Sequence, residues 1–232
     1  MISENTTETN SPKLVSEGAD IDNGGLIHRV LEPSQPGPHP TVVLLHGRSG
    51  DENAMWIFSR VLPEDWLVVA PRGIKPDPAG GWAWHPRQRD EWPALAMFDP
   101  AVTAVTNFIS SLPELYSADP ERIYLMGFSQ GAATAYALAM GHPGLVQGIA
   151  GLVGFVPVEC DAAIETVVLK DLPIFMAAGR SDHYIPFTRT QGCAQTLRDS
   201  GADLTFRDYD TGHRLTAQGM RDLQSWWDQF AD

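Results

Sequence analysis

Seven short apolar segments, separated by longer stretches with helical spacing, constrain the fold of this chain more than any other feature. Several of them are apolar on both faces, as strands are when they lie inside a parallel sheet. The last segment alternates in polarity, which indicates an edge strand with one wetter face. Strands that alternate with helices form a mostly parallel sheet, so we predict a single α/β domain. The seven predicted strands are 26–31, 41–45, 66–70, 122–126, 148–155, 174–178 and 204–209.

Apolar residues three and four positions apart predict helices between these strands. Residues 101–112 place their apolar side chains on one helical face, and we expect this helix to end at Pro113. The same spacing recurs in 187–197 and in 220–230. Helices on both faces of the central sheet complete the predicted architecture.

The chain has 232 residues, a length that fits one ordinary domain. Residues 1–18 are rich in Ser, Thr, Glu and Asn and contain little that could be buried. We therefore predict a disordered or loosely attached N-terminal tail over 1–18. The folded domain is expected to span 19–232.

Composition argues against several classes of function. Sixteen Lys and Arg residues against 29 Asp and Glu residues give a net charge of −13, which disfavours binding to nucleic acid or to anionic lipid. No uninterrupted apolar run approaches the roughly 18 residues of a membrane-spanning helix. The N-terminus has no secretory signal, so we expect a cytoplasmic protein without stable membrane insertion. Cys160 and Cys193 are too few for a disulfide framework or a cysteine-rich zinc site.

The segment 71–93 interrupts the alternation of strands and helices. It contains five prolines, three glycines and three tryptophans, Trp82, Trp84 and Trp92. A loop of this length is unusual in a compact domain and often belongs to a functional site. The tryptophans are expected either to shield the core or to form an aromatic wall of a pocket, and the pattern does not decide between these roles.

The strongest chemical signal is the G-x-S-x-G pattern at 127–131. It follows an apolar strand and opens an alanine-rich helix that Gly141 is expected to cap. A nucleophile elbow needs this context, because a sharp turn lifts the serine hydroxyl above the sheet. We therefore predict Ser129 as a nucleophile; the alternative is a tight turn in which Ser129 only caps the helix.

A serine hydroxyl needs a base to take its proton and an acid to orient that base. On such a sheet the order along the chain is Ser, then acid, then His. Asp182 follows the predicted strand 174–178, and His213 follows the predicted strand 204–209. The carboxyl ends of parallel strands lie at one edge, so we predict Ser129, Asp182 and His213 as a catalytic triad.

Other residues compete for these roles. His183 is the closest rival as base, but it adjoins Asp182, and sequence neighbours seldom face each other. Asp208 and Asp210 are alternatives to Asp182 as the acid. His46 ends a buried strand, where we expect it to order a loop rather than to react. The remaining histidines have no ligand spacing, so no metal site is expected.

An oxyanion hole needs two N–H donors. One is expected from Gln130, at the start of the helix after the serine. The other is expected from the early turn that contains Gly47 and Arg48. We assign it to the backbone of Arg48, although Ser49 is equally within reach.

LLHGRSGDEN, the PRG turn, GFSQGAATAYALA, AAGRSDHYIP and DTGHRL occur in this order. Together they resemble the phospholipase/carboxylesterase family of small serine hydrolases, related to acyl-protein thioesterases, from about residue 24 to the C-terminus. The resemblance implies an α/β-hydrolase fold without a separate lid domain. It also implies Ser129, Asp182 and His213 as the triad and the N–H groups of Arg48 and Gln130 as the oxyanion hole. The expected activity is cofactor-independent hydrolysis of a small-molecule carboxylic ester or thioester.

The chain departs from many members at Arg48, where they carry an uncharged residue. A charged side chain near the pocket would disfavour long acyl chains or attract an anionic group. Cleavage of thioesters, lysophospholipids or lactones remains an alternative on the same fold, and so does a non-catalytic binding protein. A homodimer is compatible with the sequence, which does not fix the oligomeric state.

Overall fold

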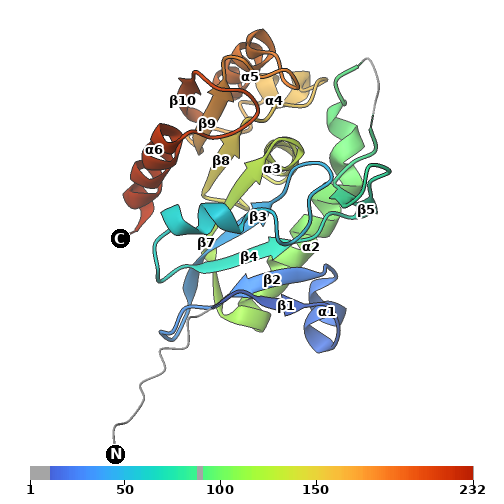
Figure 1. Cartoon of the computed structure of the whole chain (residues 1–232), viewed down its shortest axis with the longest axis vertical. Helices are drawn as coiled ribbons and strands as arrows, with labels where there is room; N and C mark the ends of the chain where they lie inside the picture. Colours follow the sequence, from blue (N-terminus) through green and yellow to red (C-terminus); the bar gives the residue numbers. More distant parts are fainter. Residues whose placement is uncertain (1–10, 88–90, 232) are drawn as a thin grey trace, which may run out of the picture.

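Eight strands form one central sheet in the computed structural model, which describes residues 11–87 and 91–231. Two antiparallel strands, β1 and β2, form one edge, and β2 also pairs antiparallel with β4. From β4 to β10 all neighbouring strands are parallel, so the sheet is mostly parallel, as predicted. Across the sheet the order is β1 (Lys13–Val15), β2 (His28–Leu31), β4 (Leu67–Pro71), β3 (His39–Leu45), β7 (Ala118–Phe128), β8 (Gly148–Leu152), β9 (Pro173–Gly179) and β10 (Asp203–Tyr209) (Figure 1).

All seven predicted strands are confirmed, because each overlaps one strand of this sheet. Strand β10 lies at the edge and leaves most of its side chains partly exposed, as its alternating pattern predicts. The interior strands are apolar on both faces because both faces are covered. In β3, Val42 and Leu44 belong to one buried cluster and Val43 and Leu45 to another, and all four are fully buried.

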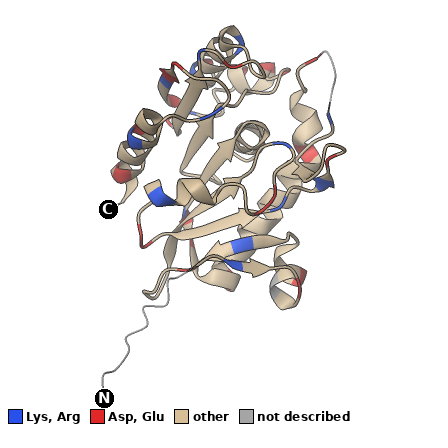
Figure 2. Ribbon diagram, viewed as in Figure 1, with Lys and Arg blue, Asp and Glu red and all other residues tan. Residues whose placement is uncertain are grey.

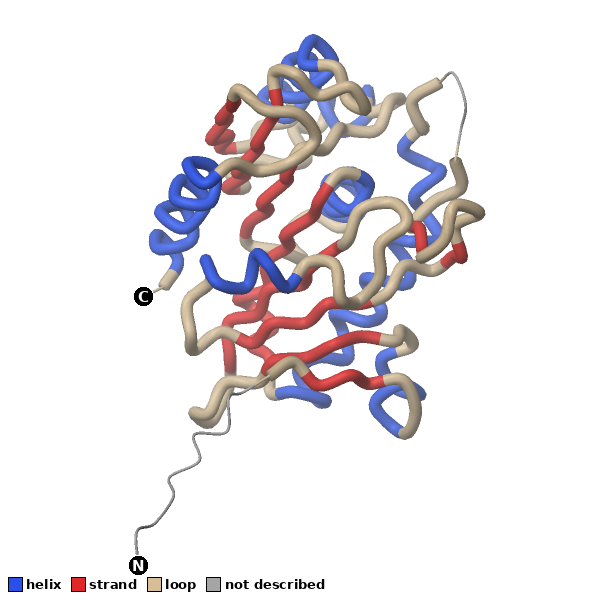
Figure 3. Tube along the Cα trace, viewed as in Figure 1, coloured by secondary structure: helices blue, strands red, loops and turns tan. Residues whose placement is uncertain are grey.

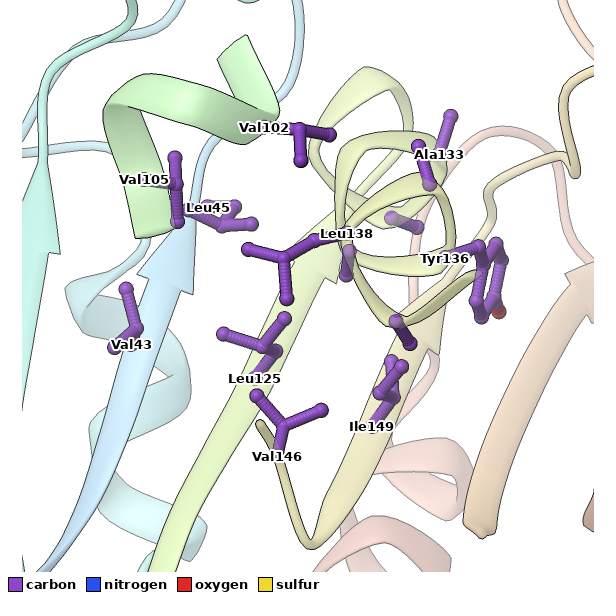
Figure 4. Packing of buried hydrophobic residues seen from close by; sticks show 14 of the residues in the cluster. Val43, Leu45, Val102, Val105, Leu125, Ala133, Tyr136, Leu138, Val146 and Ile149 are labelled. Atoms are coloured by element: carbon purple, nitrogen blue, oxygen red, sulfur yellow. The ribbon is translucent and has the colours of Figure 1, made fainter. Parts of the chain in front are cut away.

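The helices form two layers, one on each face of the sheet (Figure 3). The larger core lies under α2, α3 and α5; in it Leu138 of α3 packs near Leu45 of β3 and Leu125 of β7 (Figure 4). The smaller core lies under α6 and η1 and is rich in tryptophan. The helices are α1 (Ala19–Gly24), α2 (Asp99–Tyr116), α3 (Gln130–Gly141), α4 (Asp161–Glu165), α5 (Phe187–Asp199) and α6 (Ala217–Trp227), with 3-10 turns η1 (Trp56–Val61), η2 (Leu95–Phe98) and η3 (Asp228–Phe230).

The prediction that the helix over 101–112 ends at Pro113 is wrong. Helix α2 contains Pro113 and continues to Tyr116, which is buried. The fixed φ of proline suits a helix, and near the C-terminal end its missing N–H removes only one hydrogen bond. Ser117 then ends the helix in the left-handed region (φ 54°), and its N–H donates to the Pro113 carbonyl at 3.1 Å. Packing of Tyr116 in the core therefore outweighs the local signal of the proline.

The predicted C-cap is displaced by one residue as well. Gly141 is the last residue of α3, and His142 occupies the cap position. The glycine still lies at the helix end, where the sequence places it.

The segment Leu95–Tyr116, with a mean hydropathy of 1.2, is the only helical stretch of the described residues with the length and apolarity of a membrane span. Here its apolar face is part of the core, because Val105, Phe108 and Leu112 are buried in the larger cluster. Charged residues lie in loops, on helices and on strands such as β1, β2 and β10 (Figure 2), whereas β3 and β8 contain no Lys, Arg, Asp or Glu.

Within the described residues, regular structure begins before the expected domain start at residue 19. Lys13–Val15 forms strand β1, which pairs with β2 so that Val15 lies opposite His28, and Val15 is buried. The predicted tail 1–18 is therefore corrected over 13–15, while its first ten residues lie outside the described residues.

A two-stranded ribbon, β5 (Lys75–Pro76) with β6 (Trp82–Ala83), stands apart from the central sheet.

Candidate active site

Ser129 occupies the sharp turn between β7 and α3, as predicted. Its backbone has φ 54° and ψ −113°, a conformation that residues with a side chain rarely adopt. The flanking glycines are required by close packing of the backbone. A Cβ atom at Gly127 would lie 2.4 Å from the Ala132 nitrogen, and one at Gly131 would lie 2.0 Å from the Leu45 carbonyl oxygen. The turn therefore depends on glycine at both positions.

His213 and Asp182 are joined by a hydrogen bond of 2.7 Å between Nδ1 and Oδ2. The other carboxylate oxygen of Asp182 accepts the backbone N–H groups of Tyr184 at 2.8 Å and Ile185 at 3.0 Å. Asp182 is buried, so these donors replace the water that it loses. The carboxylate is thus held in place and fixes the orientation of the imidazole.

Ser129 and His213 line the same pocket, which has a volume of about 610 Å³. The rings of Phe128 and Tyr184 flank His213, with centroids 5.2 and 5.1 Å from the imidazole centroid. The three residues predicted as a triad therefore come together: two reach the pocket, and Asp182 contacts His213.

The competing candidates lie elsewhere. The side chain of His183 is exposed, and the described residues that line the pocket do not include it. Asp208 forms an ion pair with Arg180, and Asp210 is exposed. His46 is fully buried and orders two turns, as expected: its Nδ1 bonds with the Gly47 carbonyl at 2.7 Å, and its Nε2 accepts the Gly73 N–H at 2.8 Å.

The two residues predicted to supply the oxyanion hole, Arg48 and Gln130, also line the pocket. Gln130 is the first residue of α3, so its N–H is one of the helix donors without an intrahelical acceptor. The positive end of the helix dipole lies at the same place. Arg48 follows strand β3, and Ser49, the alternative donor, lines the pocket beside it with φ 61°.

The described residues of the segment 71–93, here called the tryptophan-rich segment, pack directly against the turn after β3 and the start of α3, which carry the two predicted oxyanion donors. The Trp84 backbone N–H donates to Gln130 Oε1 at 2.8 Å, and its indole N–H donates to the His46 carbonyl at 2.8 Å. The Trp82 N–H donates to the Gly50 carbonyl at 2.8 Å. The segment therefore holds the turn after β3 and the start of α3 in one arrangement.

The three tryptophans have different roles, so both sequence-based interpretations apply. Trp84 is 1% exposed and belongs to the larger core, which fits the shielding interpretation. Trp82 is half-buried, with the Arg72 guanidinium 5.1 Å from its ring centroid. Trp92 lines the pocket beside Phe155, their ring centroids 5.1 Å apart, and together they form an aromatic wall.

Sequence reasoning missed many of the pocket residues, among them Asp77, His85 and Phe155. Asp77 pairs with Arg48, its Oδ2 accepting from Nε at 2.8 Å. The His85 carbonyl accepts the side-chain amide of Gln130 at 3.2 Å. The only sequence signal for these residues was the unusual length of the segment 71–93, which contains Asp77 and His85 but not Phe155.

Burial controls the ionisation of several groups in this region. It lowers the pKa of His46 and of His85 below the ordinary value of 6.5, so both are neutral near pH 7. Burial also lowers the pKa of Arg48, and the nearby charge of Arg87 acts in the same direction against the opposing effect of Asp77. Within the part of the chain that the structure describes, no group of three His, Cys, Asp or Glu side chains is placed to hold a metal ion.

The chain is similar to known proteins in sequence and in fold. Residues 27–230 match the family described as phospholipase/carboxylesterase. The chain is 25% identical over 191 residues to the putative hydrolase MhqD of Bacillus subtilis, a match that covers 80% of this chain and 91% of the relative. It is 27% identical over 110 residues to acyl-protein thioesterase 1 of Gibberella zeae, covering 46% of this chain and 47% of the relative. The crystal structure of the Bacillus cereus carboxylesterase has the same α/β-hydrolase fold, with a TM-score of 0.78 at 20% identity over 90% of this chain and 96% of the other.

Proposed function

The chain belongs to the phospholipase/carboxylesterase family, and on that premise we propose that it is a serine hydrolase that cleaves carboxylic esters. The observation that carries the proposal is that one pocket is lined by Ser129, His213 and the two predicted oxyanion donors, Arg48 and Gln130. The bond between His213 and Asp182 supports it further. Serine, base, acid and N–H donors are the parts that acyl transfer requires.

In the proposed first step, His213 accepts the Ser129 hydroxyl proton at Nε2. Its Nδ1–H is committed to Asp182, which fixes this tautomer. The serine oxygen attacks the ester carbonyl, and the negative charge on the carbonyl oxygen is stabilised by the N–H groups of Arg48 and Gln130. Each such donor contributes on the order of 3 kcal/mol to the transition state. The C–O bond to the alcohol then breaks, and the alcohol leaves with the proton from His213.

In the second step, water attacks the acyl-enzyme. His213 takes one proton from this water as it adds to the carbonyl, and the same two N–H groups stabilise the oxyanion. Collapse of the intermediate breaks the bond to Ser129, which regains its proton from His213. The acid is released and the enzyme returns to its starting state.

Thioester cleavage is a second candidate, favoured by the match to a relative named acyl-protein thioesterase. The same machinery attacks a thioester carbonyl, and only the leaving group differs. Matched esters, thioesters and lactones with the same acyl chain separate these activities by kcat/KM. A lysophospholipid with the same acyl chain, added to this series, tests lysophospholipid hydrolysis.

The decisive test is hydrolysis of p-nitrophenyl esters from acetyl to palmitoyl by the wild type and by Ser129→Ala. We expect turnover by the wild type and none above background by the variant. Absence of activity on every ester, together with absence of fluorophosphonate labelling at Ser129, would mean a non-catalytic binding protein. Labelling without ester turnover would instead point to a different acyl substrate.

A further inference from the structure

We infer that the Arg48 side chain forms a carboxylate-binding subsite beside the reacting carbonyl, so that the preferred substrates are half-esters of short dicarboxylic acids. This inference rests on the proposed function, because it assigns a substrate class to the same pocket. It differs from a general ester-binding pocket in requiring a second, negatively charged group on the acyl part.

Arg48 is held in place by a buried carboxylate. Asp77, with a side chain 5% exposed, accepts Arg48 Nε at 2.8 Å through Oδ2 and the Ala79 N–H at 2.9 Å through Oδ1. Asp77 belongs to the turn between β5 and β6, which is closed by two backbone hydrogen bonds, from the Asp77 N–H to the Gly81 carbonyl and from the Gly80 N–H to the Asp77 carbonyl. The guanidinium is therefore fixed at the pocket before any ligand arrives, which reduces the entropy lost on binding.

This fixed guanidinium has donors left over. A guanidinium carries five N–H groups. Among the described residues, Nε bonds with Asp77 and Nη2 makes a long contact of 3.5 Å with the His85 carbonyl. With respect to the residues that the structure describes, these contacts engage two N–H groups and leave three for an acceptor in the pocket that Arg48 lines. A carboxylate matches them, because its two oxygens fit the fork of a guanidinium.

The local electrostatics favour an anion at this place, although the chain as a whole is acidic. Arg87 lines the same pocket. Burial and the charge of Arg87 both lower the pKa of Arg48, and a bound anion would offset this effect. Glu91 also lines the pocket but is exposed, and both oxygens of Asp77 already accept hydrogen bonds. The net charge of −13 belongs to the whole chain, and charges farther away than the Debye length, about 8 Å at physiological salt, are largely screened at this place.

The position of Arg48 in the chain limits the length of the substrate. The proposed oxyanion donor and the carboxylate donor belong to the same residue, so their ligands lie within the reach of one side chain. The charged group must therefore be only a few bonds from the ester carbonyl. Short dicarboxylic half-esters meet this condition, whereas a long acyl chain would place apolar carbons against the guanidinium and leave its donors unpaired.

The test compares monoethyl glutarate with ethyl valerate, which have the same acyl length and differ in the terminal carboxylate. Acid release is followed in a pH-stat for the wild type, for Arg48→Gln and for Arg221→Gln, a control at an exposed position of α6. The backbone N–H of residue 48 is retained in Arg48→Gln. We expect the wild type to favour the half-ester, and the ratio of the two kcat/KM values to fall at least about tenfold in Arg48→Gln, as for loss of one charged hydrogen bond. Arg221→Gln is expected to keep the wild-type ratio.

Product binding provides a readout that does not depend on turnover. Glutarate is titrated calorimetrically into the wild type and into Arg48→Gln at low and high salt, and we expect binding by the wild type that weakens with salt and is lost in the variant. An equal ratio in wild type and Arg48→Gln, with equal glutarate affinity, overturns the subsite while leaving the esterase proposal intact. Failure of the wild type to hydrolyse either ester, with no fluorophosphonate labelling, overturns the proposed function; glutarate binding that depends on Arg48 would then still support the subsite.

Discussion

Trp84 and Gln130, separated by 46 positions in the sequence, are joined by a 2.8 Å hydrogen bond from the Trp84 backbone N–H to the side-chain oxygen of Gln130. The amide nitrogen of the same side chain donates to the His85 carbonyl at 3.2 Å. Because the backbone of Gln130 is a proposed oxyanion donor, its side chain connects that donor to the tryptophan-rich segment. The side chain therefore acts as a positioning group for the start of α3.

We expect Gln130→Met to lower the free energy of unfolding by about 1–3 kcal/mol, because it leaves the buried Trp84 N–H without an acceptor. We also expect kcat to fall more than KM rises, since the oxyanion donor is displaced while the pocket remains. Urea denaturation and ester kinetics measure the two effects. Gln195→Met, at an exposed position on α5, is the matched control. Wild-type kcat in Gln130→Met would contradict the positioning role.

Asp182→Asn is expected to reduce kcat/KM by on the order of 10⁴, because an amide at this position stabilises the wrong tautomer of His213. The shape of the side chain is retained, so circular dichroism should report an unchanged fold. Asp208→Asn and Asp210→Asn test the alternative acids, and we expect both to remain close to wild-type activity. A loss in either that matches Asp182→Asn would reassign the acid.

Stability should decrease as the pH falls below about 6.5. The pKa values of His46 and His85 are lowered in the folded protein by burial, so the unfolded chain binds these protons at a higher pH than the native state does. Where the unfolded state binds more protons, the free energy of unfolding decreases as the pH is lowered, by up to about 1.4 kcal/mol per pH unit for each histidine. Urea denaturation at pH 7.5, 6.5 and 5.5 measures this slope.

The variant His85→Gln isolates one of the two histidines in that experiment. It removes one buried imidazole, and the slope between pH 6.5 and 5.5 should become smaller than in the wild type. The comparison cancels the contribution of the acidic surface, which is common to both proteins. An identical slope in the two proteins would show that His85 does not contribute.

The two cysteines should be unreactive in the native protein. Cys160 and Cys193 are free and buried, and burial raises the pKa of both thiols, that of Cys160 to about 11. Little thiolate is therefore present at pH 8, and the thiolate is the reacting form. We expect a chromogenic disulfide reagent to label neither cysteine over minutes in buffer and both in denaturant. Fast labelling of one thiol without denaturant would indicate local opening around it.

Local patterns in the sequence were sufficient to predict the strands and to indicate that Ser129, Asp182 and His213 lie close together. A run such as residues 42–45 is apolar on both faces because the sheet is covered on both sides, and this requirement is visible residue by residue. Ser129 was predictable because Gly127 and Gly131 are imposed by the turn itself. Asp182 and His213 were predictable because parallel strands bring their carboxyl ends to one edge.

Contacts of the tryptophan-rich segment could not be predicted in this way. The pairs Arg48–Asp77 and Trp84–Gln130 join an irregular segment to turns that are distant in sequence, and no periodicity encodes such a pairing. Strand β1 was missed because three residues are too few for a pattern. The error at Pro113 has the opposite origin, since a strong local signal was overridden by burial of Tyr116.

The positive φ of Ser129 lowers the stability of the fold at the same residue that the proposed chemistry requires. A side chain in this region of backbone conformation costs on the order of 1–3 kcal/mol, which glycine would not incur. Ser129→Gly is thus expected to melt at a higher temperature than Ser129→Ala, and no lower than the wild type, while losing the nucleophile. Selection for thermostability alone would favour loss of the nucleophile at this position, so any stabilised version of this protein needs a simultaneous screen for turnover.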